Sequence, residues 1–371
     1  MMRRGLTLTL IVLLAMVAFG VGVYARLASF KTRGVVAASP NAPLRVSPKF
    51  RLPGTMFLAQ GGSIYRLQGG LFRQIATGNW TQPVLSPDHS QLVAVARFAD
   101  ESDLYLLDLN GNIIRQLTHN ASRVVDFNHW SFYPRFSPDG QTLFYSWDPK
   151  NQDNLYRVDL VVYAMPLAGP QSRARAWTEP YFWTGGDVQP VPLRSGSLLY
   201  TKFDISDQTN QPYSRIWLTT RAGAVGKALT LPRDNCAQPA LSPDETMLAM
   251  ICTAGGQTGQ LVVAPFNGTT LGPLRHLIDG QLCAAPAWSP DGTGLAYFAA
   301  TGASGHFQLF YLAVPPAPSP SPSASTAAST SPKASATPSA RPTPSPAPLV
   351  PIQVSYDLDF DATAAPAWSA G

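Results

Sequence analysis

The chain has 371 residues, of which 13% are charged, and it is rich in glycine (29) and proline (35). This composition is typical of short strands joined by tight turns and excludes a helical bundle, because Gly and Pro provide the backbone angles that turns require. The formal charge of +5 comes from residues 1–50, which hold seven basic residues and no acid. The other 20 basic and 22 acidic residues exclude a basic nucleic-acid-binding domain, so we expect no nucleic-acid partner.

The N-terminal segment has the pattern of a membrane anchor or of a signal sequence. Arg3 and Arg4 precede an uncharged apolar run from Leu6 to Tyr24, which as a helix would span about 28 Å, close to the thickness of the bilayer core. We expect residues 1–25 either to stay as a single transmembrane helix with a cytoplasmic N-terminus or to be cleaved as a signal. Residues 26–50 are then a linker, and the remaining chain lies outside the cytoplasm, at the cell membrane or secreted.

A phrase of the form Pro-x-apolar-Ser-Pro-Asp recurs along the chain. Its first proline lies at positions 83, 134, 190, 239, 286 and 366, at intervals of 51, 56, 49, 47 and 80 residues, and the copies at 190 and 366 are degraded. We interpret Pro-x-apolar as a short strand that begins at the proline, and Ser-Pro-Asp as a tight turn. Further β-rich runs follow each turn, for example 104–109 and 113–117 after the first. Four antiparallel strands per unit, repeated around an axis, predict the blades of a β-propeller.

The long last interval contains residues 315–348, which are almost wholly Pro, Ser, Ala and Thr. Such a segment cannot bury apolar area, so we expect a disordered insertion between the third and fourth strands of the fifth blade, either carrying O-linked sugars or serving as a solvated spacer. Without these 34 residues the interval is 46, close to its neighbours.

We therefore predict an all-β, six-bladed propeller over residues 51–314 and 349–371, with blades of four antiparallel strands. The segment 349–371 supplies the outer strand of the fifth blade and the first strand of the sixth. The N-terminal runs 56–59, 63–67 and 71–75 supply the other strands of the sixth blade, so that this blade is shared between the two ends of the chain. The alternative is a chain end that only resembles a repeat.

The repeat as a whole resembles that of TolB-type propellers, which are related to WD repeats. The resemblance rests on apolar-Ser-Pro-Asp-Gly followed by Leu and aromatic residues, clearest at 134–147 and 286–298, and on Leu-Tyr-x-x-Asp-Leu-x-Gly ending in Leu-Thr at 104–118. It covers about 55–314 and 349–371. The resemblance implies a secreted or periplasmic binding platform, but the fold alone does not identify a function, because propellers serve as enzymes, sensors and scaffolds.

The three cysteines allow a disulfide. If Leu241 pairs with Met247 across the turn, their numbers sum to 488, and those of Cys236 and Cys252 give the same sum. The two cysteines then face each other across the hairpin, where a disulfide is plausible outside the cytoplasm. The alternatives are three free buried thiols or a bond between Cys236 and Cys283 in neighbouring blades.

Aromatic residues crowd the segments that precede the first strands, around one mouth of the channel. With two acids from the same segments they form a candidate ligand face: Trp80, Trp130, Tyr133, Trp183, Asp187 and Asp234. Exposed Trp and Tyr are natural anchors for a partner, but large aromatics also fill the space between blades. Both interpretations stay open at this point.

We expect a non-catalytic, monomeric binding or scaffold module whose partner is a protein, a peptide or a glycan. The histidines lack metal-ligand spacing, and no nucleophile elbow or phosphate-binding loop is present, so no catalytic residue, metal or cofactor is predicted. The alternative is an extracytoplasmic lyase or glycan hydrolase that uses carboxylates at the channel mouth, namely Asp187, Asp234, Asp359 or Asp361. Two of these carboxylates close together would favour the enzyme.

Overall fold

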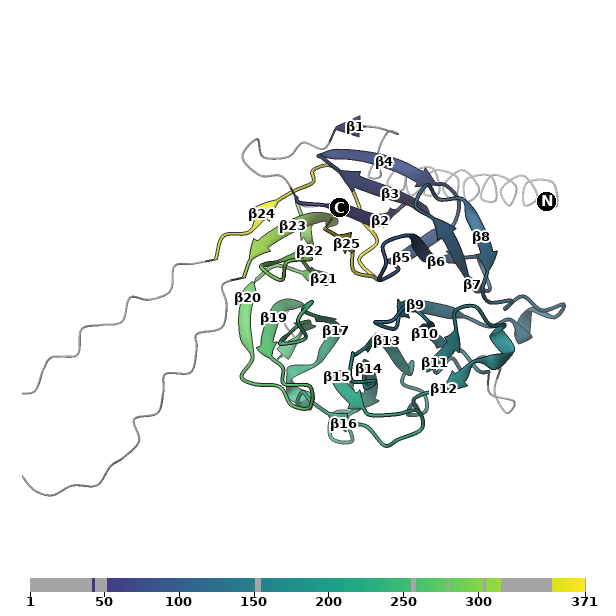
Figure 1. The fold of residues 1–371 in the computed structure, drawn as a ribbon. Coiled ribbons are helices and arrows are strands. Elements are labelled where there is room, and N and C mark those ends of the chain that lie inside the picture. Colours follow the sequence, from purple (N-terminus) through teal and green to yellow (C-terminus); the bar gives the residue numbers. More distant parts are fainter. Residues whose placement is uncertain are drawn as a thin grey trace, which may run out of the picture.

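The computed structural model describes residues 52–150, 155–254, 258–278, 280–302, 305–314 and 349–370, with the backbone of 42–43. The predicted N-terminal helix and the predicted insertion at 315–348 lie outside these residues. Within them the chain forms six sheets arranged around a central axis (Figure 1). Helical structure there is limited to short 3-10 turns, and no helix is long and apolar enough to span a membrane.

The first three blades follow one another along the chain, each with its strands in sequential order from the axis outward. Their bounds are β5 (Trp80–Leu85), β6 (Gln91–Arg97), β7 (Ser102–Asp108) and β8 (Ile113–Gln116); β9 (Ser131–Phe136), β10 (Thr142–Trp147), β11 (Val161–Pro166) and β12 (Arg175–Ala176); β13 (Asp187–Pro192), β14 (Leu198–Ile205), β15 (Pro212–Thr219) and β16 (Lys227–Ala228). Three 3-10 turns, η1 (Val125–Phe127), η2 (Gln171–Arg173) and η3 (Pro232–Asp234), lie in the connections.

Blades four and five repeat this plan, and the sixth sheet contains strands from both ends of the described chain. The bounds are β17 (Cys236–Leu241), β18 (Met247–Cys252), β19 (Gln260–Pro265) and β20 (Arg275–Ile278); β21 (Cys283–Trp288), β22 (Gly294–Thr301), β23 (His306–Ala313) and β24 (Ile352–Gln353); β1 (Ala42–Pro43), β2 (Thr55–Gln60), β3 (Ser63–Gln68), β4 (Leu71–Ala76) and β25 (Ala367–Ser369). The prediction of an all-β, six-bladed propeller with four-stranded antiparallel blades is confirmed.

The Ser-Pro-Asp turns are held as the sequence predicts. In four blades the serine hydroxyl donates to the aspartate two residues later, over 2.5–2.6 Å, and accepts the backbone N–H five residues later. These hydroxyl donors lower the pKa of the turn carboxyls, for example that of Asp139. The four recurring aspartates therefore close turns, each in its own blade.

The repeat proline lies inside the first strand, which corrects the prediction that the strand begins there. In blade one, Thr81 pairs with Val95 and Val84 with Val93, so that Gln82 and Pro83 form a bulge. The residue before the proline has a positive φ of 51–56° in five blades, at Gln82, Tyr133, Gln189, Gln238 and Ala285. A bulge accepts proline because one residue leaves the hydrogen-bonded ladder.

A hydroxyl at the end of the fourth strand fixes that strand to the third. It accepts a backbone N–H over 2.8–3.1 Å in four blades, through Thr118, Thr178, Thr230 and Ser355. This contact gives the recurring Leu-Thr of the sequence a structural role, because it satisfies a buried N–H beyond the last ladder hydrogen bond.

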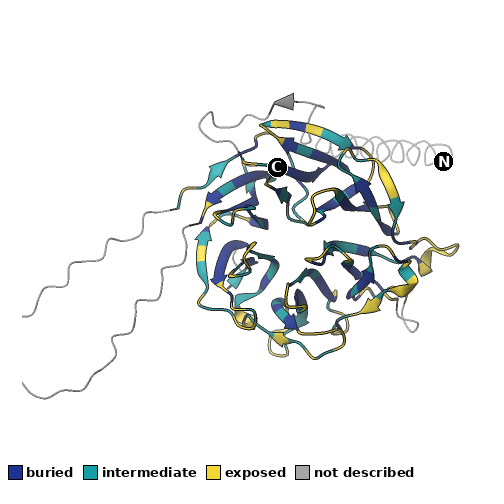
Figure 2. Cartoon of the chain, in the orientation of Figure 1, coloured by how far each residue is buried: buried dark blue, intermediate teal, exposed yellow. Residues whose placement is uncertain are grey.

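The hydrophobic core is divided among the six interfaces between blades (Figure 2). Blades five and six share one cluster, and blades six and one share another that joins Phe57 to Trp80 and Leu92. The cluster between blades two and three is the smallest, with five buried residues around Phe144 and Tyr200. Polar and aromatic contacts beside this cluster, described next, also join the two blades.

Candidate functional site

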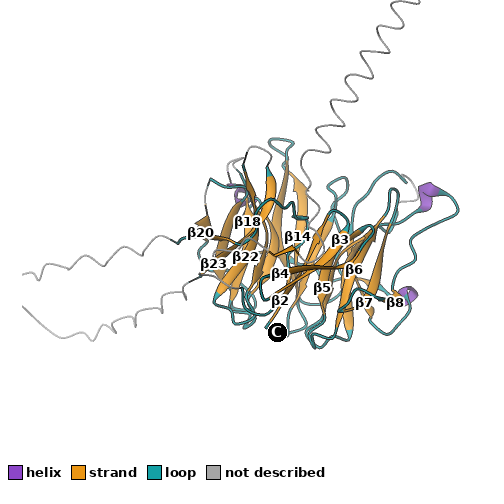
Figure 3. Ribbon diagram, turned by 90° about the horizontal axis from the view of Figure 1, so that it is seen from above, coloured by secondary structure: helices purple, strands orange, loops and turns teal. Residues whose placement is uncertain are grey.

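The two faces of the ring differ in their exposed side chains. The loops that lead into each first strand, together with the loops between second and third strands, lie on one face, which we call the aromatic face; the Ser-Pro-Asp turns lie on the other, the turn face (Figure 3). Seventeen large hydrophobic side chains are exposed among the described residues. Twelve of them lie on the aromatic face: Phe98, Val124, Val125, Phe127, Tyr156, Val158, Tyr181, Phe182, Trp183, Leu231, Leu282 and Tyr356.

The loop between blades two and three carries three consecutive exposed aromatics. Tyr181, Phe182 and Trp183 are 43%, 69% and 62% exposed. The loop is fixed from beneath, because the carboxylate of Asp159 accepts the backbone N–H groups of Trp183 (3.0 Å), Thr184 (3.1 Å) and Gly185 (3.2 Å). Three charge-assisted hydrogen bonds to one carboxylate hold the backbone in place, so the aromatic rings project from a preorganised loop.

Arg157 joins this carboxylate to the aromatic rings. Its Nε lies 2.9 Å from Asp159 Oδ2, and its guanidinium lies over the ring of Phe182 (4.4 Å to the centroid) and near that of Trp183 (5.6 Å). Cation–π contacts of this kind stabilise ring orientation. One face of Phe182 is therefore occupied by the guanidinium, while the side chain as a whole stays largely exposed.

A buried ion pair lies under the same loop. Lys202 Nζ lies 3.2 Å from Asp187 Oδ1, donates to the carbonyl of Glu179 (2.6 Å) and sits 4.3 Å from the ring centroid of Tyr181. Asp187 is fully buried and Lys202 nearly so. Burial raises the pKa of Asp187 to about 6, although Lys202 and a hydrogen bond from Thr178 act to lower it.

Three further contacts on blade three again bring together a cation, a carboxylate and aromatic side chains. Arg215 pairs with Asp204 (3.1 Å) and lies 5.2 Å from the ring centroid of Trp217, while the Tyr213 hydroxyl donates to the same carboxylate (2.6 Å). Desolvation and this hydrogen bond raise the pKa of Tyr213 to about 12.

A hollow of about 340 Å³ opens beside the aromatic loop. It is lined by Asp148, Pro149, Lys150, Arg157, Asp159, Val161, Pro180 and Phe182. Its two carboxylates and two cations are paired, Lys150 with Asp148 (2.9 Å) and Arg157 with Asp159. The hollow therefore has no net charge and offers polar edges next to an exposed ring.

The candidate ligand-face residues occupy three different environments. Trp80 packs in the core between blades six and one, edge-on to Tyr105 (5.4 Å), and Trp130 is half-buried and stacked on Phe132 (5.7 Å). Tyr133 lines the central channel, and only Trp183 is largely exposed. Among the Trp and Tyr residues of the set, Trp183 alone presents a broad surface to a partner.

The four carboxylates considered for catalysis each have their own partner. Asp187 pairs with Lys202, and Asp234 accepts the backbone N–H of Leu231 (2.9 Å) within η3. Asp359 lies 2.9 Å from His306 Nδ1, and Asp361 is hydrogen-bonded to Thr81 and Thr363. Asp187 begins β13 and Asp234 lies in η3, whereas Asp359 and Asp361 share the connection between β24 and β25. Within the described residues, no group of three His, Cys, Asp or Glu side chains is arranged to hold a metal ion.

The central channel is crossed by a belt of glutamines, formed by Gln82, Gln189 and Gln238. Each side-chain Oε1 accepts the N–H of the corresponding bulge residue in the next blade: Gln82 from Tyr133 (2.6 Å), Gln189 from Gln238 (2.9 Å) and Gln238 from Ala285 (2.7 Å). These bonds satisfy the backbone at the positive-φ positions and join neighbouring blades. They enclose a small cavity, of about 30 Å³ for the centres of water molecules, at the middle of the ring.

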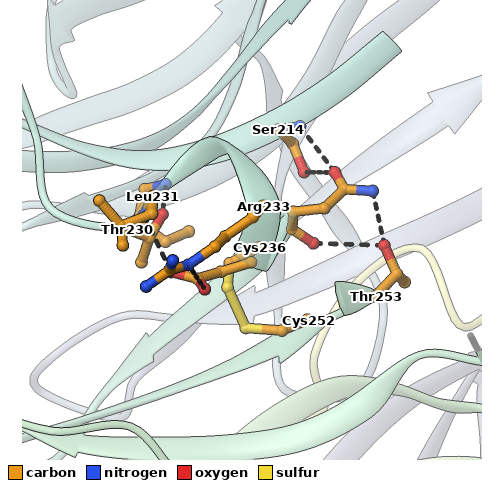
Figure 4. Close-up of a disulfide and its surroundings, with 10 residues drawn as sticks. Ser214, Thr230, Leu231, Arg233, Cys236, Cys252 and Thr253 are labelled. Carbon is orange, nitrogen blue, oxygen red and sulfur yellow. Dashed lines mark hydrogen bonds and ion pairs between the residues drawn. A yellow bond between two sulfur atoms is a disulfide. The ribbon is translucent and has the colours of Figure 1, made fainter. Parts of the chain in front are cut away.

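Cys236 and Cys252 pair directly between β17 and β18, and their sulfurs form a disulfide (Figure 4). The assumed register was wrong by one residue, because Leu241 pairs with Leu248 and not with Met247. The bulge at Gln238 and Pro239 shifts the register back, so the two effects cancel. Cys283 is buried and is not part of the disulfide. Next to Cys236 in the chain, Asn235 accepts the backbone N–H of Ser214 through Oδ1 (2.7 Å) and donates from Nδ2 to the Thr253 hydroxyl (2.6 Å).

Sequence reasoning missed the cations and carboxylates that position the aromatic loop, namely Arg157, Asp159 and Lys202, and it missed the glutamine belt. The glutamines had a detectable signal, since Gln precedes the repeat proline in three copies. Arg157 lies in a loop between second and third strands, and Lys202 stands on a second strand where other blades have Ala96, Trp147, Cys252 or Ala299, so no recurrence marks them.

Comparison with known proteins identifies the fold. No family model and no curated protein sequence matches the chain. Among solved structures, TolB from Acinetobacter baumannii is 15% identical, with a TM-score of 0.57 over 87% of this chain and 68% of that one. A putative TolB from Agrobacterium tumefaciens is 16% identical (TM-score 0.48, 71% and 86% covered), and an oligogalacturonate lyase from Vibrio parahaemolyticus is 14% identical (0.46, 74% and 80%). The chain therefore has the fold of a TolB-like six-bladed β-propeller.

Proposed function

We propose that this chain is a non-catalytic binding module that works outside the cytoplasm and holds a protein or peptide partner on its aromatic face. The observation that carries the proposal is the loop Tyr181–Trp183, whose exposed rings are fixed by Asp159 and Arg157. Exposed aromatic groups cost solubility, and rigid Trp, Tyr and Arg side chains are the usual anchors of protein interfaces. The concentration of exposed hydrophobic side chains on the same face supports an extended contact.

Two features support a location outside the cytoplasm. The disulfide between Cys236 and Cys252 is of a kind that persists in oxidising compartments. The apolar run from Leu6 to Tyr24 behind two arginines is suited to a membrane anchor or a signal sequence. A catalytic role for the channel-mouth carboxylates would require at least two of them to approach one substrate atom, and each is engaged in a separate contact.

The proposal is tested with a paired surface variant. Replacing Phe182 and Trp183 by Ser removes the two most exposed rings of the loop, whereas replacing Leu71 and Ile113 by Ser removes two side chains of similar exposure (58% each) on strands β4 and β8. Partners of the full-length chain are captured by cross-linking in the cell envelope, and the affinity of a purified partner is measured for each variant. We expect the loop variant to bind at least about tenfold more weakly and the control to bind as the wild type does. Equal binding by both variants would refute the proposal.

We further propose that the ring is closed in solution by the two ends of the chain, through a shared sixth blade. The support is the pairing of Met56 with Trp368 and of Phe57 with Ala367, together with the donation from Trp368 Nε1 to the carbonyl of Pro53 (2.8 Å). Cysteines introduced at Met56 and Trp368 should form a disulfide that joins the N-terminal and C-terminal tryptic fragments. Failure of that cross-link under oxidising conditions would argue against closure.

A further inference from the structure

One arginine differs from every other residue at its place in the repeat. The position after the repeat proline is Val84, Val191, Ala240, Ala287 or Ala367 in five blades, and Arg135 in blade two. These positions lie on the first strands, next to the axis. Arg135 lines both the small cavity at the glutamine belt and a larger cavity on its turn-face side. A cation therefore stands in the channel where the other blades place a small apolar side chain.

Arg135 has no partner among the described residues. No carboxylate lies within ion-pair distance of its guanidinium and no hydrogen bond is made by it, whereas Arg157, Lys202 and Arg215 each lie within 3.2 Å of a carboxylate. Burial lowers the pKa of Arg135, and no neighbouring charge offsets this effect. The guanidinium still stays protonated at neutral pH, so an unbalanced positive charge lies deep in the ring.

A second donor faces the same cavity. Gln189 Oε1 accepts from the Gln238 N–H (2.9 Å) and from the Thr201 hydroxyl (2.9 Å), which fixes the orientation of its amide. Its Nε2 donates to no atom of the described residues, unlike that of Gln82, which donates to Thr363, and that of Gln238, which donates to the carbonyl of Ala362. Gln189 and Arg135 line one cavity and leave it with donors that lack an acceptor.

The cavity on the turn-face side, which we call the vestibule, is lined by apolar side chains with backbone polar groups exposed between them. Its volume is about 320 Å³, within the range of small-molecule sites. Apart from Arg135, every lining side chain is that of Val, Leu, Phe, Trp, Ala or Pro, among them Val84, Phe136, Ala287, Trp288 and Trp368. The two indole N–H groups already donate to the carbonyls of Ala240 and Pro53, so Arg135 is the polar side chain available to a ligand.

We propose that the channel binds a small organic carboxylate, whose charged group pairs with Arg135 and whose apolar body fills the vestibule. A guanidinium presents two parallel N–H groups that match the two oxygens of a carboxylate. Phosphate or sulfate would bring further oxygens, and no vestibule side chain other than Arg135 has a free donor for them. The carboxylate can belong to a free acid or to the C-terminus of a short apolar peptide. The site lies in the channel, apart from the aromatic loop, and does not depend on the function proposed for that loop.

The test uses 3-phenylpropionate and its uncharged amide, 3-phenylpropionamide, as probes of the full-length chain. Binding is measured by titration calorimetry at constant ionic strength and by the fluorescence of the tryptophans, two of which line the vestibule. We expect the acid to bind at least about tenfold more tightly than the amide, and sulfate to compete poorly. Arg135→Met should abolish the preference for the acid over the amide. Arg135→Lys keeps the charge but not the two parallel N–H groups of the guanidinium, so it should retain part of this preference.

Three further measurements distinguish the possible ligands and sites. A tripeptide of leucine with a free C-terminus, compared with its amidated form, tells whether a peptide end reaches Arg135. Ala287→Trp narrows the vestibule and should weaken binding of the acid while Arg135 stays in place. The Phe182→Ser and Trp183→Ser variant should bind the acid as the wild type does, which separates this site from the aromatic face. Equal binding of acid and amide, an unchanged preference in a folded Arg135→Met variant, or tighter binding of sulfate would each overturn the proposal.

Discussion

Lys202 and Arg135 are two cations in opposite circumstances, the first nearly fully buried and the second half-buried. Lys202 lies under the aromatic loop, 3.2 Å from the carboxylate of Asp187, with a carbonyl and a tyrosine ring as further neighbours. Arg135 stands in the channel with no partner among the described residues. A paired buried cation stabilises its surroundings only through its partner, whereas an unpaired one lowers stability unless a ligand supplies the opposite charge. The contrast therefore separates a cation that supports the fold from one that suits a ligand.

The largest expected effect is the loss of Lys202. Lys202→Met leaves Asp187 buried without its cation, and breaking a buried pair in this way costs about 3–5 kcal/mol of the free energy of unfolding. Chemical denaturation at pH 8 measures the loss. The matched control is Lys227→Met, on exposed strand β16, which should change stability by less than about 0.5 kcal/mol. If Lys202→Met were as stable as the control, the pair would not support the loop.

The next effect is the pH dependence that Asp187 brings. Its pKa is raised to about 6 in the folded chain, above its ordinary value of 3.8, so the folded state binds the proton more tightly than the unfolded state does. The contribution of this carboxyl is therefore fully present below pH 3.8 and is lost as pH rises through 6, by about 2–3 kcal/mol in total. We expect the stability of the wild type relative to Asp187→Asn to fall over this interval. A difference that stays constant between pH 4 and 7 would contradict the assignment.

The strands could be predicted closely because their signals are local. The run 247–252 matches β18, and 63–67 and 71–75 each match a strand to within one residue at either end. The first strand of each blade was the exception, because we interpreted the repeat proline as the residue at which that strand begins. The positive φ at the preceding residue runs against the usual preference before proline, and the hydrogen bonds that offset it come from the neighbouring blade. Such contacts cannot be read from one repeat.

The candidate site shows the same limit. Of the aromatic loop, sequence reasoning singled out Trp183, because it lies just before a first strand. The residues that hold this loop in place come from other parts of the chain. Asp159, for example, accepts the N–H of Trp183 and pairs with Arg157 at the interface of blades two and three. Arg135 had a signal, a cation among Val and Ala at one repeat position, but only the fold shows that this position faces the channel.

The smallest expected effect is the loss of Arg135, and its sign is what matters. Without a ligand, Arg135→Met should raise the free energy of unfolding by about 1 kcal/mol, because it removes an unpaired charge and adds apolar area to the wall of the vestibule. The effect is modest because Arg135 is only half-buried, so water in the channel solvates part of the charge.

Denaturation of the ligand-free protein measures this change in the free energy of unfolding, with Arg123→Met on an exposed loop as the control for a change in net charge. With saturating 3-phenylpropionate the order should reverse, since the ligand stabilises only the chain that binds it. Destabilisation by more than about 1 kcal/mol in the absence of ligand would instead show that the protein already supplies Arg135 with a partner.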